Sequence, residues 1–348
     1  MHSPLPRNGK RPRGQRRRVW FAGAVTTAAA LTAVGCSTGS TSDGATAAAT
    51  AGTAASGSKL ILLELPFPCG LNDYATQTCN GALAAAKTLP HGYTFAIKTS
   101  LNYTDAASFN AVIQTSLQLK PAGLIVFANG PAAQTPYLNR GCTQGVKVIW
   151  YDTPGQGVKC AVSLIAPNHY QLGVQAGKYL IAHPPANGSK EVAIVGQQPG
   201  EFHSNDLRVS GFTKTVEAAG YKIVQTVVST NALDQTRTGV TNMLTAHPGV
   251  GAVFAANGPL GDGAAEALRG NHSVVLLTTD GNVTDIPMVE NGTFAADVAQ
   301  DPYNGGKTAV EYMLQVLRGR KVPSQYLEPY LVVSKGNAKS YISAGGMR

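Results

Sequence analysis

Short apolar runs alternate with longer amphipathic stretches along most of the chain. The runs are rich in Val, Ile and Leu and have the length of buried strands, whereas the stretches between them repeat apolar positions at helical spacing. Buried strands that alternate with helices are typical of parallel sheets built from βαβ units. The expected strands include residues 60–65, 94–97, 123–128, 146–151, 191–195, 223–228, 250–255, 274–278 and 294–298. The expected helices include residues 73–88, 104–119, 168–182, 204–219, 234–246 and 302–318.

This pattern predicts an α/β fold of two Rossmann-like lobes, each with a parallel sheet. Residues 59–348 number 290, which is enough chain for two lobes of ordinary size. Beyond residue 35 no apolar run reaches the ~18 residues of a membrane-spanning helix, so none is predicted there. Short polar side chains that precede helical patterns are expected as N-caps, namely Asp105, Asn168, Ser204 and Asp234.

The first 35 residues have the composition of an export signal. Residues 1–18 hold seven of the 28 Lys and Arg residues and none of the 19 acids, and residues 19–35 are uncharged. Their length and flanks suit a signal peptide better than a permanent membrane span. We therefore expect residues 1–35 to be a signal peptide. The Arg17-Arg18 pair is too small a part of a twin-arginine motif to identify the export route.

Ala33-Val34-Gly35-Cys36 resembles a bacterial lipobox, although Leu is usual where Ala33 stands. In lipoproteins of this kind the cysteine is linked to diacylglycerol and becomes the new amino terminus. Residues 36–58 continue without an aromatic or large aliphatic side chain, which predicts a disordered linker behind a lipidated Cys36. The protein is then exported and anchored by lipid to the outer face of the cell membrane. The alternative is ordinary cleavage nearby, with Cys36 unmodified.

The formal net charge of +9 belongs mostly to the leader. Without the seven leader residues, 21 Lys and Arg remain against 19 Asp and Glu, so the rest of the chain is close to neutral. A basic surface of the kind that binds nucleic acid is therefore not expected.

Four cysteines remain once Cys36 is set aside: Cys69, Cys79, Cys142 and Cys160. An even number outside the reducing cytoplasm favours disulfides. Four cysteines allow three pairings, among which Cys69–Cys79 with Cys142–Cys160 closes the shortest loops. No Cys-x-x-Cys or Cys-x-x-His spacing supports a metal site, so none is predicted.

Polar groups recur where the expected strands end. In open α/β sheets, ligands bind in the crevice beyond the carboxyl ends of the strands. Carboxylates and carboxamides there suit a neutral polyhydroxylated molecule, because each hydroxyl both donates and accepts, and an aromatic face can pack on a sugar ring. The residues at these ends are Pro66-Phe67, Asn129, Asp152, Gly196-Gln197, Asn257, Asp280 and Gln300.

Four motifs follow one another along the second half of the chain: Arg208-x-x-Gly211-Phe212, the stretch 243–257, Thr278-Thr-Asp-Gly281 and Val298-Ala-Gln300. Through these motifs, in this order, the chain from residue 59 to about residue 333 resembles the type I periplasmic solute-binding proteins, specifically the ribose-binding group related to LacI-type repressors. The resemblance implies two lobes joined by a hinge of several crossings. It places residues 59–165 plus 300–328 in the N-terminal lobe and residues 166–299 plus 329–348 in the C-terminal lobe.

The resemblance also implies a ligand site with groups from both lobes. Asp152 would accept ligand hydroxyls from the first lobe, and Arg208 would reach the ligand from the second. Two further strand-end residues would bond hydroxyls, one residue lies near the hinge, and the first loop aligns loosely with one that supplies an Asn and aromatic rings. The implied ligand-binding residues are Phe67, Asn72, Tyr74, Asp152, Arg208, Asn257, Asp280 and Gln300.

Three features differ from the pattern of ribose binders. The first loop, residues 66–73, is longer; Thr153 stands where ribose binders place an Arg; and Gly258 stands where an acid is common. The resemblance therefore implies a small polyhydroxylated ligand, a sugar or polyol, without specifying ribose.

The function implied is that of a monomeric solute-binding lipoprotein of an ABC import system. It would need no cofactor, would dock on a permease in the membrane, and would touch the membrane itself only through its lipid. The alternative is a receptor of the same fold that presents its closed form to a membrane signalling partner. An enzyme is not expected, because the chain lacks Gly-x-Ser-x-Gly, His-Glu-x-x-His and a phosphate-binding Gly-rich loop. A leader and linker stand where a repressor of this superfamily would carry its DNA-reading helices.

Overall fold

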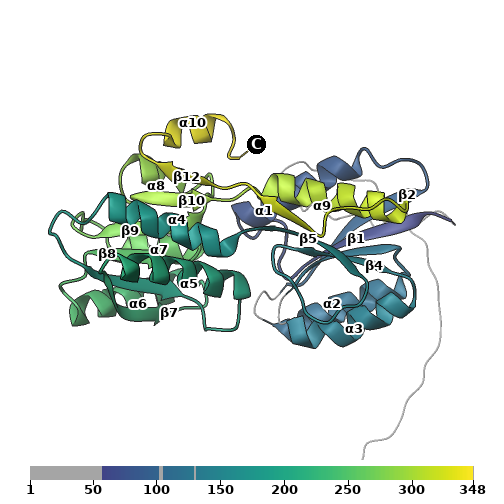
Figure 1. Ribbon diagram of the computed structural model, residues 1–348, viewed down its shortest axis with the longest axis horizontal. Coiled ribbons are helices and arrows are strands. Elements are labelled where there is room, and N and C mark those ends of the chain that lie inside the picture. The colour runs from purple at the N-terminus through teal and green to yellow at the C-terminus, as the bar shows by residue number, and fades with distance from the viewer. Residues whose placement is uncertain (1–56, 102–104, 129–130, 348) are drawn as a thin grey trace, which may run out of the picture. The chain divides into compact units, whose positions relative to one another are not determined.

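A computed structural model describes residues 57–101, 105–128 and 131–347, all within one compact unit of residues 51–348. The predicted signal peptide, Cys36 and the linker as far as residue 56 lie outside the described residues. The described chain forms two six-stranded sheets, each covered by helices on both faces (Figure 1). This confirms the predicted α/β fold of two lobes with parallel sheets.

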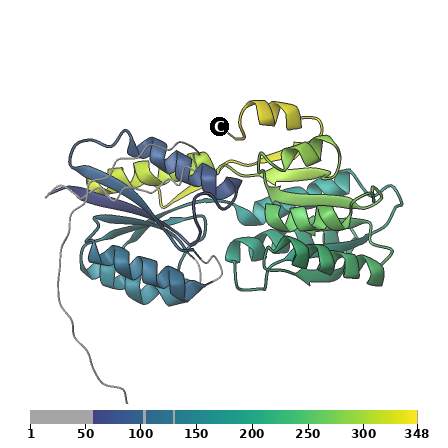
Figure 2. The ribbon, with the colours of Figure 1, turned by 180° about the vertical axis from the view of Figure 1, so that it is seen from behind.

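The first sheet has the strand order β11-β5-β4-β3-β1-β2, and all its neighbours are parallel. Its strands are β1 (Lys59–Leu65), β2 (Tyr93–Thr99), β3 (Gly123–Phe127), β4 (Lys147–Tyr151), β5 (Ala161–Pro167) and β11 (Gln325–Glu328). Two helices cover each face, as the view from behind also shows (Figure 2). They are α1 (Asp73–Ala86) with α9 (Pro302–Leu317), and α2 (Ala106–Gln118) with α3 (Pro131–Thr143).

The second sheet has the order β12-β10-β9-β8-β6-β7, with β12 antiparallel to β10 and the other pairs parallel. Its strands are β6 (Glu191–Gly196), β7 (Lys222–Val228), β8 (Ala252–Ala255), β9 (Val275–Asp280), β10 (Ala296–Ala299) and β12 (Leu331–Ser334). Its helices are α4 (His169–Ala182), α5 (His203–Ala218), α6 (Leu233–Ala246), α7 (Gly258–Ala267), α8 (Ile286–Glu290) and α10 (Ala338–Ser343).

The apolar runs of the sequence become the buried centres of these sheets. Central strands such as β3 and β8 are buried along their whole length, because helices cover both faces. The strands β5, β11 and β12 were not among the expected runs. In β11, for example, the sequence Gln-Tyr-Leu-Glu has no apolar continuity, since the strand lies at a sheet edge and is partly exposed.

Three connections pass between the sheets, from β5 to α4, from β10 to α9 and from β11 to β12. This is the connectivity of a hinge with several crossings, while the residue boundaries predicted for the two lobes stay a prediction. Within the same described residues, no helix combines the length and the apolarity that crossing a bilayer requires.

Two of the four predicted N-caps are confirmed. Asp105 and Asn168 each accept a backbone N–H of the first turn that follows. Ser204 and Asp234 are wrong as N-caps, because α5 and α6 begin earlier and enclose them in their first turns. In α6 the side chain of Gln235 instead reaches back and accepts a backbone N–H of the preceding loop at 2.9 Å.

Each sheet carries one pair of helices that approach closely through glycines. A Cβ atom at Gly173 in α4 would lie 1.9 Å from the carbonyl oxygen of Arg208 in α5. A Cβ atom at Gly211 in α5 would come similarly close to the backbone of α4. Gly81 and Gly306 play the same part between α1 and α9. Because no side chain separates the backbones, the position of α5, and of Arg208 on it, is fixed by direct contact with α4.

Candidate functional site

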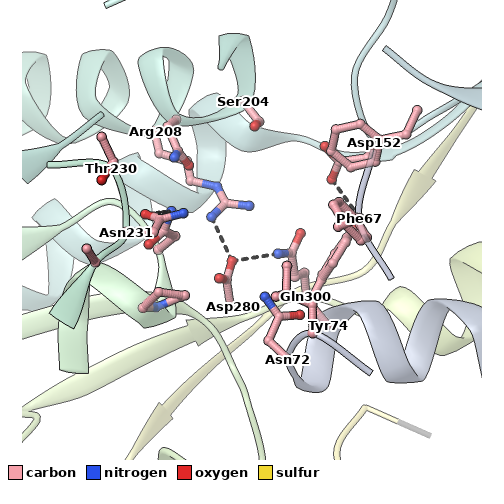
Figure 3. A pocket seen from close by; sticks show the side chains of 16 residues that line it. Phe67, Asn72, Tyr74, Asp152, Ser204, Arg208, Thr230, Asn231, Asp280 and Gln300 are labelled. Carbon is pink, nitrogen blue, oxygen red and sulfur yellow. Dashed lines mark hydrogen bonds and ion pairs between the residues drawn. The ribbon is translucent and has the colours of Figure 1, made fainter. Parts of the chain in front are cut away.

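A cavity of about 430 Å³ lies at the carboxyl ends of both sheets (Figure 3). The structure brings all eight sequence-predicted ligand-binding residues into its lining, and their contact with a ligand stays a prediction. The eight are Phe67, Asn72, Tyr74, Asp152, Arg208, Asn257, Asp280 and Gln300.

Aromatic rings form much of the first lobe's wall. Phe67 meets Tyr74 and Phe127 edge to face, with ring centroids 6.3 Å and 5.3 Å apart. Tyr74 donates its hydroxyl to Asp152 Oδ1 at 2.9 Å. Asn72 caps α1 through Oδ1, which accepts a backbone N–H of the first turn at 2.9 Å and holds the residue at the cavity. The wall therefore combines ring faces with oriented polar groups.

Asp152 presents a buried carboxylate to the cavity. The residue follows β4, is 3% exposed and has a left-handed φ of 58°. Such a backbone is uncommon for residues other than Gly and is tolerated best by Asn and Asp. Besides Tyr74, the hydroxyl of Thr153 donates to its Oδ2 at 2.9 Å. The turn thus aims the carboxylate at the ligand space instead of continuing the strand.

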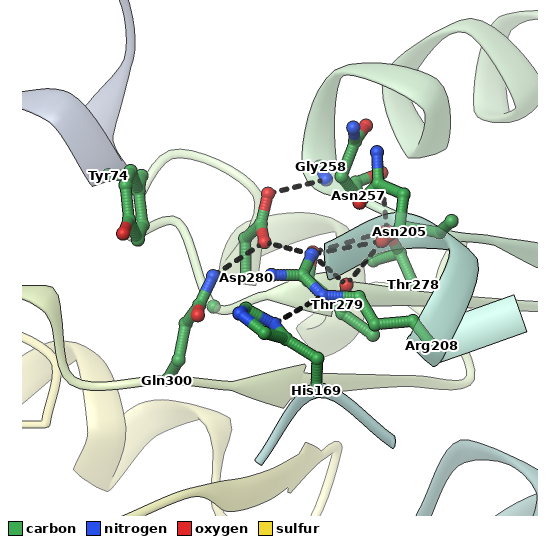
Figure 4. A network of polar contacts seen from close by, with 12 residues as sticks. Tyr74, His169, Asn205, Arg208, Asn257, Gly258, Thr278, Thr279, Asp280 and Gln300 are labelled. Atoms are coloured by element: carbon green, nitrogen blue, oxygen red, sulfur yellow. Dashed lines mark hydrogen bonds and ion pairs between the residues drawn. The ribbon is translucent and has the colours of Figure 1, made fainter. Parts of the chain in front are cut away.

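Arg208 is the centre of the second lobe's wall. Its Nη1 donates to Asp280 Oδ1 at 2.7 Å, to Thr279 Oγ1 at 2.9 Å and to the Ala256 carbonyl at 3.0 Å (Figure 4). Its Nε donates to His169 Nδ1 at 3.3 Å. Among the described residues Nη2 has no hydrogen-bond partner, so it remains for a ligand.

His169 supports the guanidinium from below as a neutral ring. Burial is the main reason that the pKa of His169 is lowered to about 4; Asp152 opposes this shift, and the charge of Arg208 adds to it. The ring accepts from Arg208 through Nδ1, and Nε2 is then the protonated nitrogen that donates to the Asp152 carbonyl at 3.1 Å. At neutral pH the 3.5 Å approach of Nε2 to Asp152 Oδ1 is therefore not an ion pair.

Asp280 ends β9 with a positive φ of 111° and is tied on both oxygens. Oδ1 accepts from Arg208 and, at 2.8 Å, from Gln300 Nε2, while Oδ2 accepts from the Gly258 N–H at 3.0 Å. The Oε1 atom of Gln300 is buried without a partner among the described residues. Arg208, Asp280 and Gln300 form a network of planar polar groups, and the side that faces the cavity can hydrogen-bond to hydroxyl groups.

Asn257 is both a helix cap and a cavity residue. Its Oδ1 accepts the Leu260 N–H at the start of α7, and its Nδ2 donates to Asn231 Oδ1 at 3.1 Å. One N–H of Nδ2 is left for a ligand. Asn231 has a left-handed φ of 68°, so it too stands at a turn after a strand.

Sequence reasoning missed half of the lining and the support behind Arg208. Thr230 and Asn231 follow the run 223–228, so the strand-end rule would have found them. His169 gave no signal, because its place under Arg208 depends on how α4 packs on α5. The other lining residues that were missed are Leu71, Phe127, Ser204, Asn205, Ala232 and Pro259.

Two disulfides join the cysteines in the local pairing. Cys69 and Cys79 tie the first loop to α1, and Cys142 and Cys160 tie α3 to the start of β5. Only the first pair lies beside the cavity wall. Residues 57–101, 105–128 and 131–347 contain no group of three or more His, Cys, Asp or Glu side chains that could hold a metal ion.

Removing the two disulfides separately is expected to separate stability from binding. Each double Cys→Ser variant should lose about 3 kcal/mol of unfolding free energy, as loops of this length imply. Only the Cys69/Cys79 variant should also weaken ligand binding, because it frees the loop that carries Phe67 and Asn72. Denaturant unfolding and calorimetry measure the two effects, and equal loss of affinity in both variants would contradict this role of the loop.

The family model for the periplasmic binding protein domain matches residues 66–321. The chain belongs to the type I periplasmic binding proteins, in the ribose-binding family. This family consists of binding proteins and not of enzymes. The resemblance seen in the four sequence motifs is confirmed.

Among its relatives is the ribose import binding protein RbsB of Salmonella typhimurium, 34% identical over 171 residues. That match covers 47% of this chain and 55% of the relative, so the chain spans about half the length of this curated relative. The Bacillus subtilis protein of the same name is 26% identical over 229 residues, 65% of this chain and 72% of the relative. A periplasmic solute-binding protein from Actinobacillus succinogenes with bound D-allose has a TM-score of 0.74, 23% identity and coverage of 81% and 100%, a likeness of fold.

Proposed function

We propose that this chain is the extracytoplasmic solute-binding lipoprotein of an ABC import system and that it encloses a small polyhydroxylated ligand, a sugar or polyol, between its lobes. The observation that carries the proposal is one cavity with Asp152 on one side and the Arg208, Asp280 and Gln300 network on the other. The curated relatives named for ribose import, and the D-allose in the similar structure, support the same ligand class.

Hinge closure explains how such a cavity would capture its ligand. A ligand favours the closed form only if it gains contacts there that the open form lacks. Here the polar groups belong to different lobes, so a ligand that touches both gains those contacts on closure. Exclusion of water then strengthens each hydrogen bond. Asp73 Oδ2 already accepts the Val283 N–H at 2.8 Å, a direct bond between α1 and the second lobe.

A thermal-shift screen of residues 51–348 against pentoses, hexoses and polyols tests the proposal. A ligand present at about 100 times its Kd stabilises the folded protein by about 2.7 kcal/mol through mass action. We therefore expect at least one compound to raise the melting temperature clearly. A panel that leaves the melting temperature unchanged throughout would contradict the proposal.

The lipid anchor and the monomeric state belong to the same proposal. A lipidated Cys36 would hold the binding domain near its permease at the outer face of the membrane. We expect a Cys36→Ala variant to move from the membrane fraction to the medium, and mass spectrometry of the wild-type amino terminus to find a diacylglycerol adduct. An unmodified, membrane-free wild type would overturn the anchor and leave the cavity's function untouched.

A further inference from the structure

The charges that line the cavity do not balance. Arg208 is the one cationic side chain among the described residues of the lining. It forms an ion pair with Asp280 at 2.7 Å, and the two side chains are 4% and 10% exposed. This pair neutralises itself. Asp152 is the remaining charged group of the lining, so the sum of one positive and two negative charges is −1.

Within the part of the chain that the structure describes, no Lys or Arg side chain contacts Asp152 to compensate its charge. Its oxygens accept from the hydroxyls of Tyr74 and Thr153, which are neutral donors. His169 comes within 3.5 Å, but its pKa of about 4 leaves the ring uncharged at neutral pH.

Three other described residues interact with Asp152 without adding a positive charge, namely Glu328, Tyr74 and Tyr151. Burial raises the pKa of Glu328 well above its usual range, and the neighbouring carboxylates Asp152 and Asp301 raise it further. Burial likewise raises the pKa values of Tyr74 and Tyr151, so both phenols stay neutral. A carboxylate that is 3% exposed therefore faces the cavity without a counter-charge, an arrangement that is unfavourable unless a cation is supplied.

The surroundings of Asp152 also suit a cation. The rings of Phe67, Tyr74 and Phe127 pack against one another beside the carboxylate and line the same cavity. Aromatic faces attract ammonium groups through their quadrupole. A carboxylate next to several rings is a better environment for an alkylammonium than for a second anion.

We propose that the ligand is a polyol that carries an ammonium group, such as an amino sugar or an aminocyclitol. The ammonium lies on Asp152 among the rings, and the hydroxyls bond Arg208 Nη2, Asp280 and Gln300 Oε1 on the second lobe. This inference rests on the proposed function: it narrows the class of sugars and polyols to those that carry an amine, and it replaces the neutral ligand that the strand-end residues alone suggested. Sugar acids and sugar phosphates are disfavoured by the same charge.

Calorimetric titration with matched pairs of compounds tests the inference. The probes are D-glucose with D-glucosamine, D-galactose with D-galactosamine, and myo-inositol with an aminodeoxyinositol, all at neutral pH. We expect the amine of at least one pair to bind at least tenfold more tightly than its neutral partner. If the neutral members bind as well as or better than the amines, the inference fails and the proposed function stands. If no member of any pair binds, both fail.

An Asp152→Asn variant locates the preference. The substitution removes the charge of the side chain and keeps its shape. The Kd of each neutral compound divided by the Kd of its amine partner should therefore fall at least tenfold, toward one. Asp234→Asn is the matched control, because its side chain is 86% exposed on α6 and should leave the ratio unchanged. Thermal melts of both variants show whether they remain folded. An amine preference that survives intact in a folded Asp152→Asn protein would overturn the assignment to this carboxylate.

Discussion

Replacing Arg208 with alanine is expected to weaken ligand binding by at least tenfold and to lower the free energy of unfolding by about 3 kcal/mol. In the proposed site the guanidinium offers Nη2 to the ligand, and it holds Asp280 and the Ala256 carbonyl after β8 in place. Without it, Asp280 is left as a nearly buried carboxylate with only neutral donors, Gln300 and the Gly258 N–H. The variant should still fold, because Arg208 belongs to none of the three hydrophobic clusters of the two sheets.

Calorimetry with the best ligand of the screen, together with urea unfolding, measures both losses. Arg237→Ala is the matched control, since Arg237 pairs with Asp234 on the surface with its side chain 51% exposed, and such pairs contribute little. Asp280→Ala should also lose at least tenfold in affinity. Wild-type affinity in folded Arg208→Ala protein would mean that the ligand does not bind at this wall.

The second large effect is expected from Gly211→Ala, a change of one methyl group on α5. Its Cβ would lie 2.1 Å from a backbone oxygen of α4, so the two helices must move apart. Overpacking of this kind costs about 1–3 kcal/mol of stability. Arg208 stands one helical turn before Gly211, so its displacement should also reduce ligand affinity by about tenfold.

Gly70→Ala is the control, because a Cβ there meets no atom within 4 Å and its backbone φ is not positive. Thermal melts and titrations of both variants give the comparison. A Gly211→Ala protein with wild-type melting temperature and affinity would show that the contact between α4 and α5 does not fix the position of Arg208.

Much of this site could be predicted from the sequence, because its residues follow strands whose apolar runs are unmistakable. Asp152, Asn257 and Asp280 are found by one rule: parallel strands end at one edge, and their last residues turn toward the ligand. The left-handed backbones of Asp152 and Asp280 are consistent with that turn. The family motifs added Arg208, which lies on a helix and obeys no strand-end rule.

What the sequence could not supply depends on packing between distant segments. The neutral state of His169 follows from its burial under α5, and the charge imbalance at Asp152 appears only once Arg208 is seen committed to Asp280. The N-caps of α5 and α6 were misplaced for a related reason. In α6, Gln235 reaches back to the loop, and local rules for Ser and Asp do not anticipate a partner that comes from inside the helix.

The most direct test of the account is a crystal structure of the protein with the tightest ligand from the screen. The account predicts one ligand molecule in the cavity, with polar atoms within about 3.2 Å of Asp152 from the first lobe and of Arg208 and Asp280 from the second. A ligand held by one lobe alone, or bound outside this cavity, would contradict it.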